Sequence, residues 1–172
     1  MKTVKKSFMK NLLLLLGIAL AFSSCRISAD DIRFEEVNRV EVQGITLSQM
    51  RLDLGMGMVN DSRVKITVQE GELTVSDPQG DIAQITLREA VTLPKRSAVE
   101  VTLPVSIRFR GALGIAGVLP RLQGDADKLK VRGFIRAKGG GVNRKFEISD
   151  MPLQVFLNSI GIKDLKSLNL PL

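Results

Sequence analysis

A strict alternation of apolar and polar residues recurs along the chain and constrains its fold more than any other feature. In the clearest case, Arg51, Asp53, Gly55 and Gly57 alternate with the apolar residues Met50, Leu52, Leu54, Met56 and Met58. Successive side chains of an extended strand point to opposite faces, so a period of two predicts a strand with one buried face. Strands are also predicted at 64–68, 82–90, 99–107, 129–137 and 142–148.

Turn residues separate these segments. Asp77-Pro78-Gln79-Gly80 predicts a tight turn, because proline presets φ and glycine permits positive φ. Gly139-Gly140-Gly141 predicts another. Pro104, inside one alternating segment, cannot donate to a strand ladder and predicts a sheet edge or a bulge. Six to eight strands joined by turns predict an all-β fold, a single antiparallel β-sandwich of the immunoglobulin or fibronectin-III type.

Two stretches break the alternation and predict one or two short helices. Residues 111–122 are rich in apolar side chains and carry no charge before Arg121, but Gly114 and Gly117 weaken a helix there, which we expect to end near Pro120. Residues 153–160 place apolar side chains at helical spacing, with Asp150 as the expected N-cap and Gly161 as the C-terminal stop.

The first 24 residues have the pattern of a secretory signal peptide. Four lysines precede Leu12–Phe22, which is apolar throughout. Eleven helical residues rise only about 16 Å, too little for a hydrocarbon core of roughly 30 Å. The leader ends in Phe22-Ser23-Ser24-Cys25, which resembles the lipobox of bacterial lipoproteins, with phenylalanine where an aliphatic residue is usual.

Lipidation explains why Cys25, the only cysteine, has no disulfide partner. Several acyl chains on one cysteine anchor a protein firmly. An ordinary secretory signal followed by an incidental cysteine is the alternative. Arg26, in place of an aspartate, favours attachment to the outer rather than the inner membrane of the envelope.

These features divide the chain into four segments: the signal peptide 1–24, a lipidated tether 25–34, the β-sandwich 35–150, and a C-terminal helix and tail 151–172 packed on the domain. After the leader is removed, the remainder is the size of one domain.

Composition limits the chemistry of that domain. The chain has no histidine, and Cys25 is used for the anchor, so nucleophile–histidine and histidine–metal sites are excluded. The absence of tryptophan and tyrosine disfavours a carboxylate-based sugar hydrolase, which commonly stacks sugars on such rings. We therefore expect no enzyme, no catalytic residue, no cofactor and no metal. The net charge of +7 falls by four with the leader, and nucleic acid is not an expected partner.

Every charged residue from Lys128 to Lys145 is basic. A strand here places one set of side chains on a common face: Lys128, Lys130, Arg132, Phe134, Arg136 and Lys138. This set is a candidate contact with anionic lipid, each charge contributing on the order of 1 kcal/mol close to headgroups. A solvated face that discourages edge pairing is the favoured interpretation.

The face formed by Met50, Leu52, Leu54, Met56 and Met58 is a candidate apolar groove, because flexible methionines adapt to acyl chains. An ordinary sandwich core needs the same residues and is the favoured interpretation. The uncharged segment 111–120 could likewise dip into lipid, although we favour its capping the open end of the sandwich.

Five short motifs resemble the group-2 late-embryogenesis-abundant domain, also called the water-stress and hypersensitive-response domain: Val59-Asn60-Asp61, Lys65-Ile66-Thr67-Val68, Gly80-Asp81-Ile82-Ala83, Leu93-Pro94-Lys95-Arg96-Ser97 and Val131-Arg132-Gly133-Phe134-Ile135. The resemblance covers roughly 35–150. It departs at Asn60-Asp61-Ser62, where the family often has Asn-Pro-Asn, and after Asp150. It implies a β-sandwich, bacterial lipoproteins among the members and a link to stress tolerance. Remote relatives have been suggested to bind lipid, and no catalytic residue carries over.

The sequence thus predicts a non-enzymatic, lipid-anchored envelope protein, a binding or stress-protective module at the membrane surface. The alternatives are a lipid-binding or lipid-transfer protein with an apolar groove, and a structural adaptor in an envelope complex. The expected partners are the membrane and either anionic lipid or an envelope protein.

Overall fold

The computed structural model describes residues 28–124 and 128–162, which form one antiparallel sheet of eight strands with two short helices. The strands are β1 (Ile32–Ile45), β2 (Gln49–Asn60), β3 (Ile66–Asp77), β4 (Gly80–Leu87), β5 (Val91–Leu93), β6 (Ser97–Phe109), β7 (Lys130–Gly139) and β8 (Val142–Pro152). The helices are α2 (Gly114–Gly124) and α3 (Leu153–Ser159), and a 3₁₀ turn spans Ala29–Asp31. The strand order is β1-β2-β6-β4-β3-β7-β8, with β5 paired to β3.

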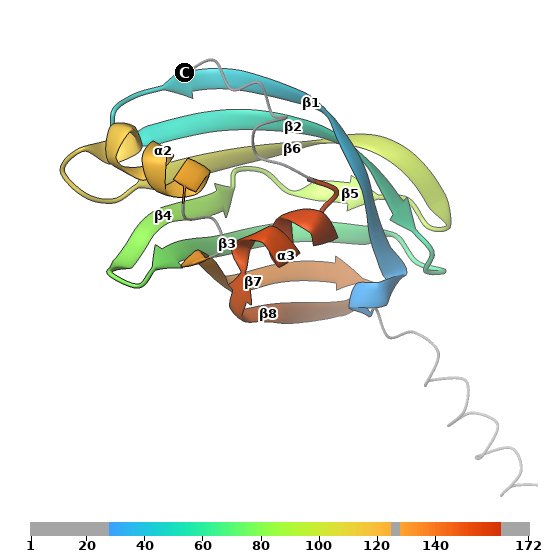
Figure 1. Cartoon of the computed structure of the whole chain (residues 1–172). Coiled ribbons are helices and arrows are strands. Elements are labelled where there is room, and N and C mark those ends of the chain that lie inside the picture. The colour runs from blue at the N-terminus through green and yellow to red at the C-terminus, as the bar shows by residue number, and fades with distance from the viewer. Residues whose placement is uncertain (1–27, 125–127, 163–172) are drawn as a thin grey trace, which may run out of the picture.

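The sheet curves until its two halves face each other as layers (Figure 1). Strands β1, β2 and β6 form the upper layer in that view, and β3, β7 and β8 the lower, with β4 joining them through hydrogen bonds to β6 and β3. The main core cluster includes Leu52 of the upper layer, Val75 and Val131 of the lower, and Phe156 of α3. The predicted all-β antiparallel sandwich with short helices is confirmed, and its layers are parts of one continuous sheet.

Both predicted turns form tight hairpins. Asp77 closes the β3–β4 turn, its Oδ1 accepting hydrogen bonds from the backbone N–H groups of Gln79 (2.8 Å) and Gly80 (3.0 Å). In the β7–β8 turn, Gly140 and Gly141 have φ values of 57° and 80°, the two positive angles that a type I′ hairpin requires.

Pro104 lies on an interior strand, so the prediction of an edge or a bulge is wrong. β6 pairs in unbroken register with β2 on one side, and its pairing with β4 ends one residue away, at Val105. Beyond that point the Pro104 carbonyl accepts a hydrogen bond from the Arg88 N–H (2.8 Å). The β4–β6 pairing, which would need an N–H from residue 104, has already ended at Val105. The proline therefore removes no hydrogen bond between strands.

The helix limits differ from the predicted ones in two places. α2 continues through Pro120 to Gly124 instead of stopping at the proline. Asp150 is not an N-cap: it belongs to β8 with φ of 42°, and Pro152 occupies the cap position of α3 without a side-chain hydrogen bond.

Gly161 ends α3 as predicted. With φ of 81°, it donates its N–H to the Asn158 carbonyl (3.2 Å), and Ile162 donates to the Leu157 carbonyl (2.9 Å). This is the paired hydrogen bonding of a Schellman cap, in which glycine takes the left-handed position. The capping turn also rests on β1, since a Cβ at position 161 would lie 1.8 Å from the Glu35 carbonyl oxygen.

The structure also places the ends of the domain. β1 begins at Ile32, so residues 32–34 of the expected tether are part of the sheet, with Ile32 opposite Asn60. Cys25 and residues 163–172 lie outside the described part of the chain. Neither helix within 28–124 and 128–162 is long and apolar enough to cross a membrane.

Candidate functional site

An apolar cavity of about 750 Å³ lies between the two layers of the sheet. Small-molecule pockets commonly measure about 300–1,000 Å³, so this cavity has the volume of a ligand site. Its lining includes, from the strands, Phe34, Met50, Leu52, Leu54, Met56, Met58, Val68, Leu73, Val75, Ile85, Leu87, Leu103, Val105, Ile107, Phe109, Ile135, Phe146 and Ile148, and from the helices Ile115, Val118, Leu153, Phe156 and Leu157.

All five residues of the predicted apolar face line this cavity. Met56 and Met58 are each 1% exposed, because they also pack against Leu93 in a second core cluster. Leu54, between them and Leu52 on an interior strand, is only half-buried because it faces the cavity. All five side chains line the cavity. Those at the two ends of the face are also buried in the core, whereas Leu54 in the middle is exposed to the cavity.

The cavity is elongated along the strands. At one end it is lined by Ile32 and Phe34, near the start of β1, and at the other by Phe109 and Ile115. The part of β2 that lines it runs from Met50 to Met58. Eight residue steps of extended strand correspond to about 26 Å. One leaflet of a bilayer's hydrocarbon core measures only about 15 Å, so a fatty acyl chain fits the long axis.

The lining offers little polar chemistry. Its polar residues are Lys145, Glu147 and Ser159. Lys145 and Glu147 pair with each other (Nζ to Oε1, 3.0 Å), and the Lys145 Nζ lies 4.6 Å from the ring centroid of Phe134, on the outward face of β7. Among the described residues, no group of acidic, histidine or cysteine side chains could hold a metal ion. The walls therefore offer contacts mainly to apolar groups.

Both helices cover the cavity. Val118 of α2 is 2% exposed, and Ile115 packs against the same core, so these residues of the uncharged segment 111–120 cap the sandwich as favoured. Leu113, just before α2, is instead 71% exposed. The segment thus divides at Gly114 into an exposed loop and a capping helix.

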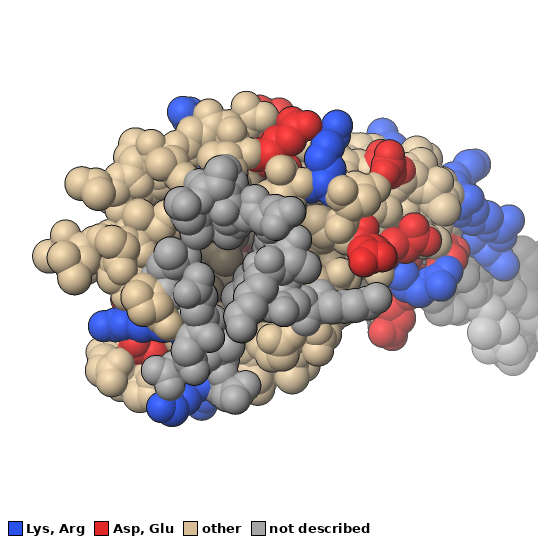
Figure 2. All heavy atoms as spheres, turned by 45° about the horizontal axis from the view of Figure 1, so that its top comes forward, with Lys and Arg blue, Asp and Glu red and all other residues tan. Residues whose placement is uncertain are grey.

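The basic side chains of β7 lie on the outward face of the sheet, together with Phe134, and both arginines of the strand are paired with acids, one on β4 and one on β3. Arg132 contacts Asp81 (Nη2 to Oδ1, 2.6 Å), and Arg136 contacts Glu70 (Nη1 to Oε2, 2.7 Å). Lys130 and Lys138 are exposed, and Lys128 precedes the strand. Figure 2 likewise shows acidic and basic side chains beside one another on another described face. Pairing reduces the positive field that the sequence alone predicts at β7.

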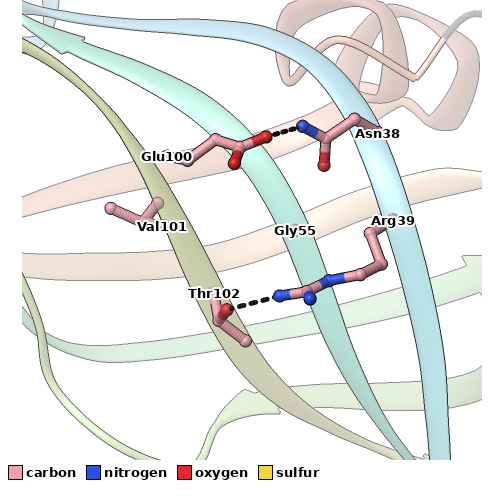
Figure 3. Close-up of a pocket in the computed structure, with 6 residues that line it drawn as sticks. All are labelled: Asn38, Arg39, Gly55, Glu100, Val101 and Thr102. Atoms are coloured by element: carbon pink, nitrogen blue, oxygen red, sulfur yellow. Dashed lines mark hydrogen bonds between the residues drawn. The ribbon is translucent and has the colours of Figure 1, made fainter.

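A second hollow, which sequence reasoning missed, lies on the outer surface over Gly55 of β2 (Figure 3). Because Gly55 has no side chain, residues of β1 and β6 meet across it. Asn38 donates a hydrogen bond to Glu100, and Arg39 Nη2 donates to Thr102 Oγ1 (3.3 Å). A Cβ at Gly55 would lie 2.9 Å from the Arg39 Cβ. These polar side chains are hydrogen-bonded to one another. We therefore interpret the hollow as a structural feature whose hydrogen bonds hold the edge strand β1 against the sheet.

No protein-family model matches the chain, and no curated protein matches it. Some solved structures show a distant similarity to the chain. A protein from Archaeoglobus fulgidus is 14% identical over 67% of this chain and 96% of its own, with a TM-score of 0.40. The GAE domain of yeast GGA1 is 16% identical over 74% of this chain and 97% of its own, with a TM-score of 0.36. A glycosyl hydrolase family 2 protein from Bacteroides cellulosilyticus is 13% identical over 70% of this chain and 14% of its own, with a TM-score of 0.33. These similarities do not support assigning any of these proteins' functions to this chain.

Proposed function

We propose that this protein is a non-enzymatic, lipid-anchored envelope protein whose folded domain binds a fatty acyl chain in the cavity between its layers. The observation that carries the proposal is the cavity itself, about 750 Å³ in volume, with strand side chains such as Leu54, Val105 and Ile107 exposed to it. Apolar surface left facing a void loses both burial and dispersion contacts. An apolar ligand restores them.

The shape and chemistry of the lining favour an acyl chain over a compact polar metabolite. A metabolite with several hydroxyl or charged groups would lose its hydrogen bonds to water and find almost no partners on these walls. A linear hydrocarbon needs no such partners and matches the long axis of the cavity.

Membrane attachment through Cys25 is the second part of the proposal. It rests on the leader and on Phe22-Ser23-Ser24-Cys25. An anchor of several acyl chains would keep the cavity close to a bilayer, the source of acyl chains. The outer membrane is the proposed location.

Native mass spectrometry of residues 26–172, which include every described strand and helix, tests the cavity. We expect the protein purified without detergent to bind one palmitate or one phospholipid. Leu54→Trp places bulk in the middle of the cavity and is expected to weaken palmitate binding by about tenfold or more, a loss of at least ~1.4 kcal/mol.

Val155→Trp is the matched control. It adds the same side chain on α3, where Val155 is 53% exposed and does not line the cavity. Palmitate binding by this variant should equal that of the unaltered protein. A protein that stays free of lipid after incubation with palmitate and phosphatidylglycerol would contradict the cavity proposal. Palmitate binding left undiminished by Leu54→Trp would contradict it as well.

Metabolic labelling tests the anchor. Cells grown with labelled palmitate should incorporate the label into the full chain, and Cys25→Ser should abolish incorporation, because the sequence contains no other thiol. Label that persists in the serine variant, or an unlabelled wild-type chain released into the medium, would show that the leader is an ordinary secretory signal.

A further inference from the structure

The two loops at one end of the sheet form a protruding apolar tip, which we define as residues 45–49 between β1 and β2 together with residues 110–114 between β6 and α2. Leu47 is 78% exposed, Leu113 is 71% exposed and Ile45 is 46% exposed. Among the side chains that the structure describes at this end of the domain, these are the three most exposed large apolar ones. Exposed apolar clusters of this kind mark contact surfaces for proteins or membranes.

The tip is held in shape by backbone contacts. Ile115 donates its N–H to the Leu47 carbonyl (2.9 Å), and Phe109 donates to the Ser48 carbonyl (2.8 Å). Gly114, with φ of 51°, lets the loops approach so closely that a Cβ there would lie 1.8 Å from the Leu47 oxygen. The two loops that carry Leu47 and Leu113 are therefore held together by backbone contacts.

The charges around the tip are basic. No acidic residue occurs in 42–52 or in 101–124. Arg51, Arg108 and Arg110 are exposed, and none of them forms an ion pair with any residue in the described ranges. The acids of the neighbouring β3–β4 turn are already paired, Asp77 with Arg121 and Asp81 with Arg132.

We infer that this tip docks into the surface of an anionic bilayer, with the two leucines in the interface and the three arginines against headgroup phosphates. Protruding side chains on a convex end insert into a fluid surface more readily than they pack against a folded protein, and the unpaired bases complement anionic lipid. Figure 2 shows uncharged atoms projecting at the end of the molecule where Figure 1 places α2. Phe109 and Ile115, which line the cavity, directly adjoin the tip, so docking would bring that end of the cavity to the bilayer.

A single tryptophan provides the test, because the natural chain contains no tryptophan or tyrosine. Leu47→Trp and Leu113→Trp are each made in the full chain and reconstituted into vesicles containing phosphatidylglycerol. Brominated lipid, which quenches only tryptophan in contact with the membrane, is supplied either in those vesicles or in vesicles added separately. The tip and Ile32, the first residue of β1 after the proposed anchor, lie at opposite ends of that strand. Both arrangements are needed because the tip can reach either the membrane that holds the anchor or a separate one.

We expect quenching and a blue-shifted emission at both tip positions in at least one arrangement. Val142→Trp, next to the β7–β8 turn at the far end of the sheet, should be quenched less than either tip position in that arrangement. Equal quenching at 142, or none at 47 and 113 in both arrangements, would overturn the inference. Tip tryptophans shielded by a copurifying protein and not by lipid would overturn it too.

Charge variants measured with the Leu113→Trp reporter complete the test. Arg51, Arg108 and Arg110 changed to Gln should weaken docking to anionic vesicles by about fivefold for each charge removed. The matched control changes Lys130 and Lys138 of the β7 face to Gln and should leave docking unchanged. An equal loss for each charge removed from the two sets would assign the binding to overall charge and overturn the inference. The inference does not depend on an occupied cavity, so it can fail or survive independently of palmitate binding.

Discussion

Replacing Asn60 with alanine is expected to lower the free energy of unfolding by about 3 kcal/mol or more. Asn60 is fully buried at the end of β2. Its Nδ2 donates to the carbonyls of Val64 (2.9 Å) and Pro94 (2.8 Å), and its Oδ1 accepts from the N–H (3.0 Å) and the hydroxyl (2.6 Å) of Ser62. Alanine removes all four of these partly buried hydrogen bonds, each of which contributes about 0.5–1.5 kcal/mol to stability.

Urea denaturation followed by circular dichroism measures the loss. Asn143→Ala is the matched control, because that amide is exposed and its Nδ2 only donates to Gln69 Oε1 (3.2 Å) on the surface. The control should change stability by no more than about 0.5 kcal/mol. If the two variants unfold at the same urea concentration, Asn60 does not hold the two loops together as we infer.

Replacing Gly133 with alanine is expected to destabilise the domain by about 4 kcal/mol. Gly133 lies in β7 with φ of 147°, a region that side chains other than glycine rarely adopt. A Cβ there would lie 2.0 Å from the Glu72 carbonyl oxygen and 2.9 Å from the Leu73 Cα. Because both contacts are with backbone of β3, relief requires β7 to move away from its partner strand.

Gly71→Ala, on β3 itself, is the matched control. A Cβ at Gly71 would meet only the Leu87 Cβ, at the ordinary distance of 3.6 Å. The thermal midpoint of this variant should stay near that of the natural protein, or rise because alanine restricts the unfolded chain. A Gly133→Ala protein as stable as Gly71→Ala would mean that β7 can shift on β3 without loss.

These two residues also give a physical account of the family resemblance. Asn60 and Gly133 belong to two of the five motifs that resemble the late-embryogenesis-abundant domain. Asn60 forms hydrogen bonds to the two loops that contain Val64 and Pro94, and Gly133 permits close contact between β7 and β3. Both motifs therefore stabilise the fold. The resemblance therefore argues for an architecture, and the proposed ligand rests on the cavity and not on the motifs.

Several errors of sequence interpretation share one cause. Pro104 predicted an edge, yet it lies on an interior strand where the pairing with β4 has just ended. Asp150 predicted a helix cap, yet it lies in β8, which extends to Pro152. In both cases the residue has the local conformational preference on which the prediction was based. Its place in the structure is decided instead by which strands pair and where that pairing ends, which no local pattern identifies.

The sequence alone identified six of the eight strands, the tight turns, the glycine stop after α3 and the inward-facing set from Met50 to Met58, but it did not identify β1 or β5. Each of these depends on a period of two or on the φ of one residue, which are properties of neighbours along the chain. The strand order, the cavity, the pairing of Arg132 with Asp81, 51 positions apart, and the hydrogen bond from Ile115 to the Leu47 carbonyl arise only in the folded molecule. These depend on contacts between distant segments, whose distances are set when the curved sheet closes on its core.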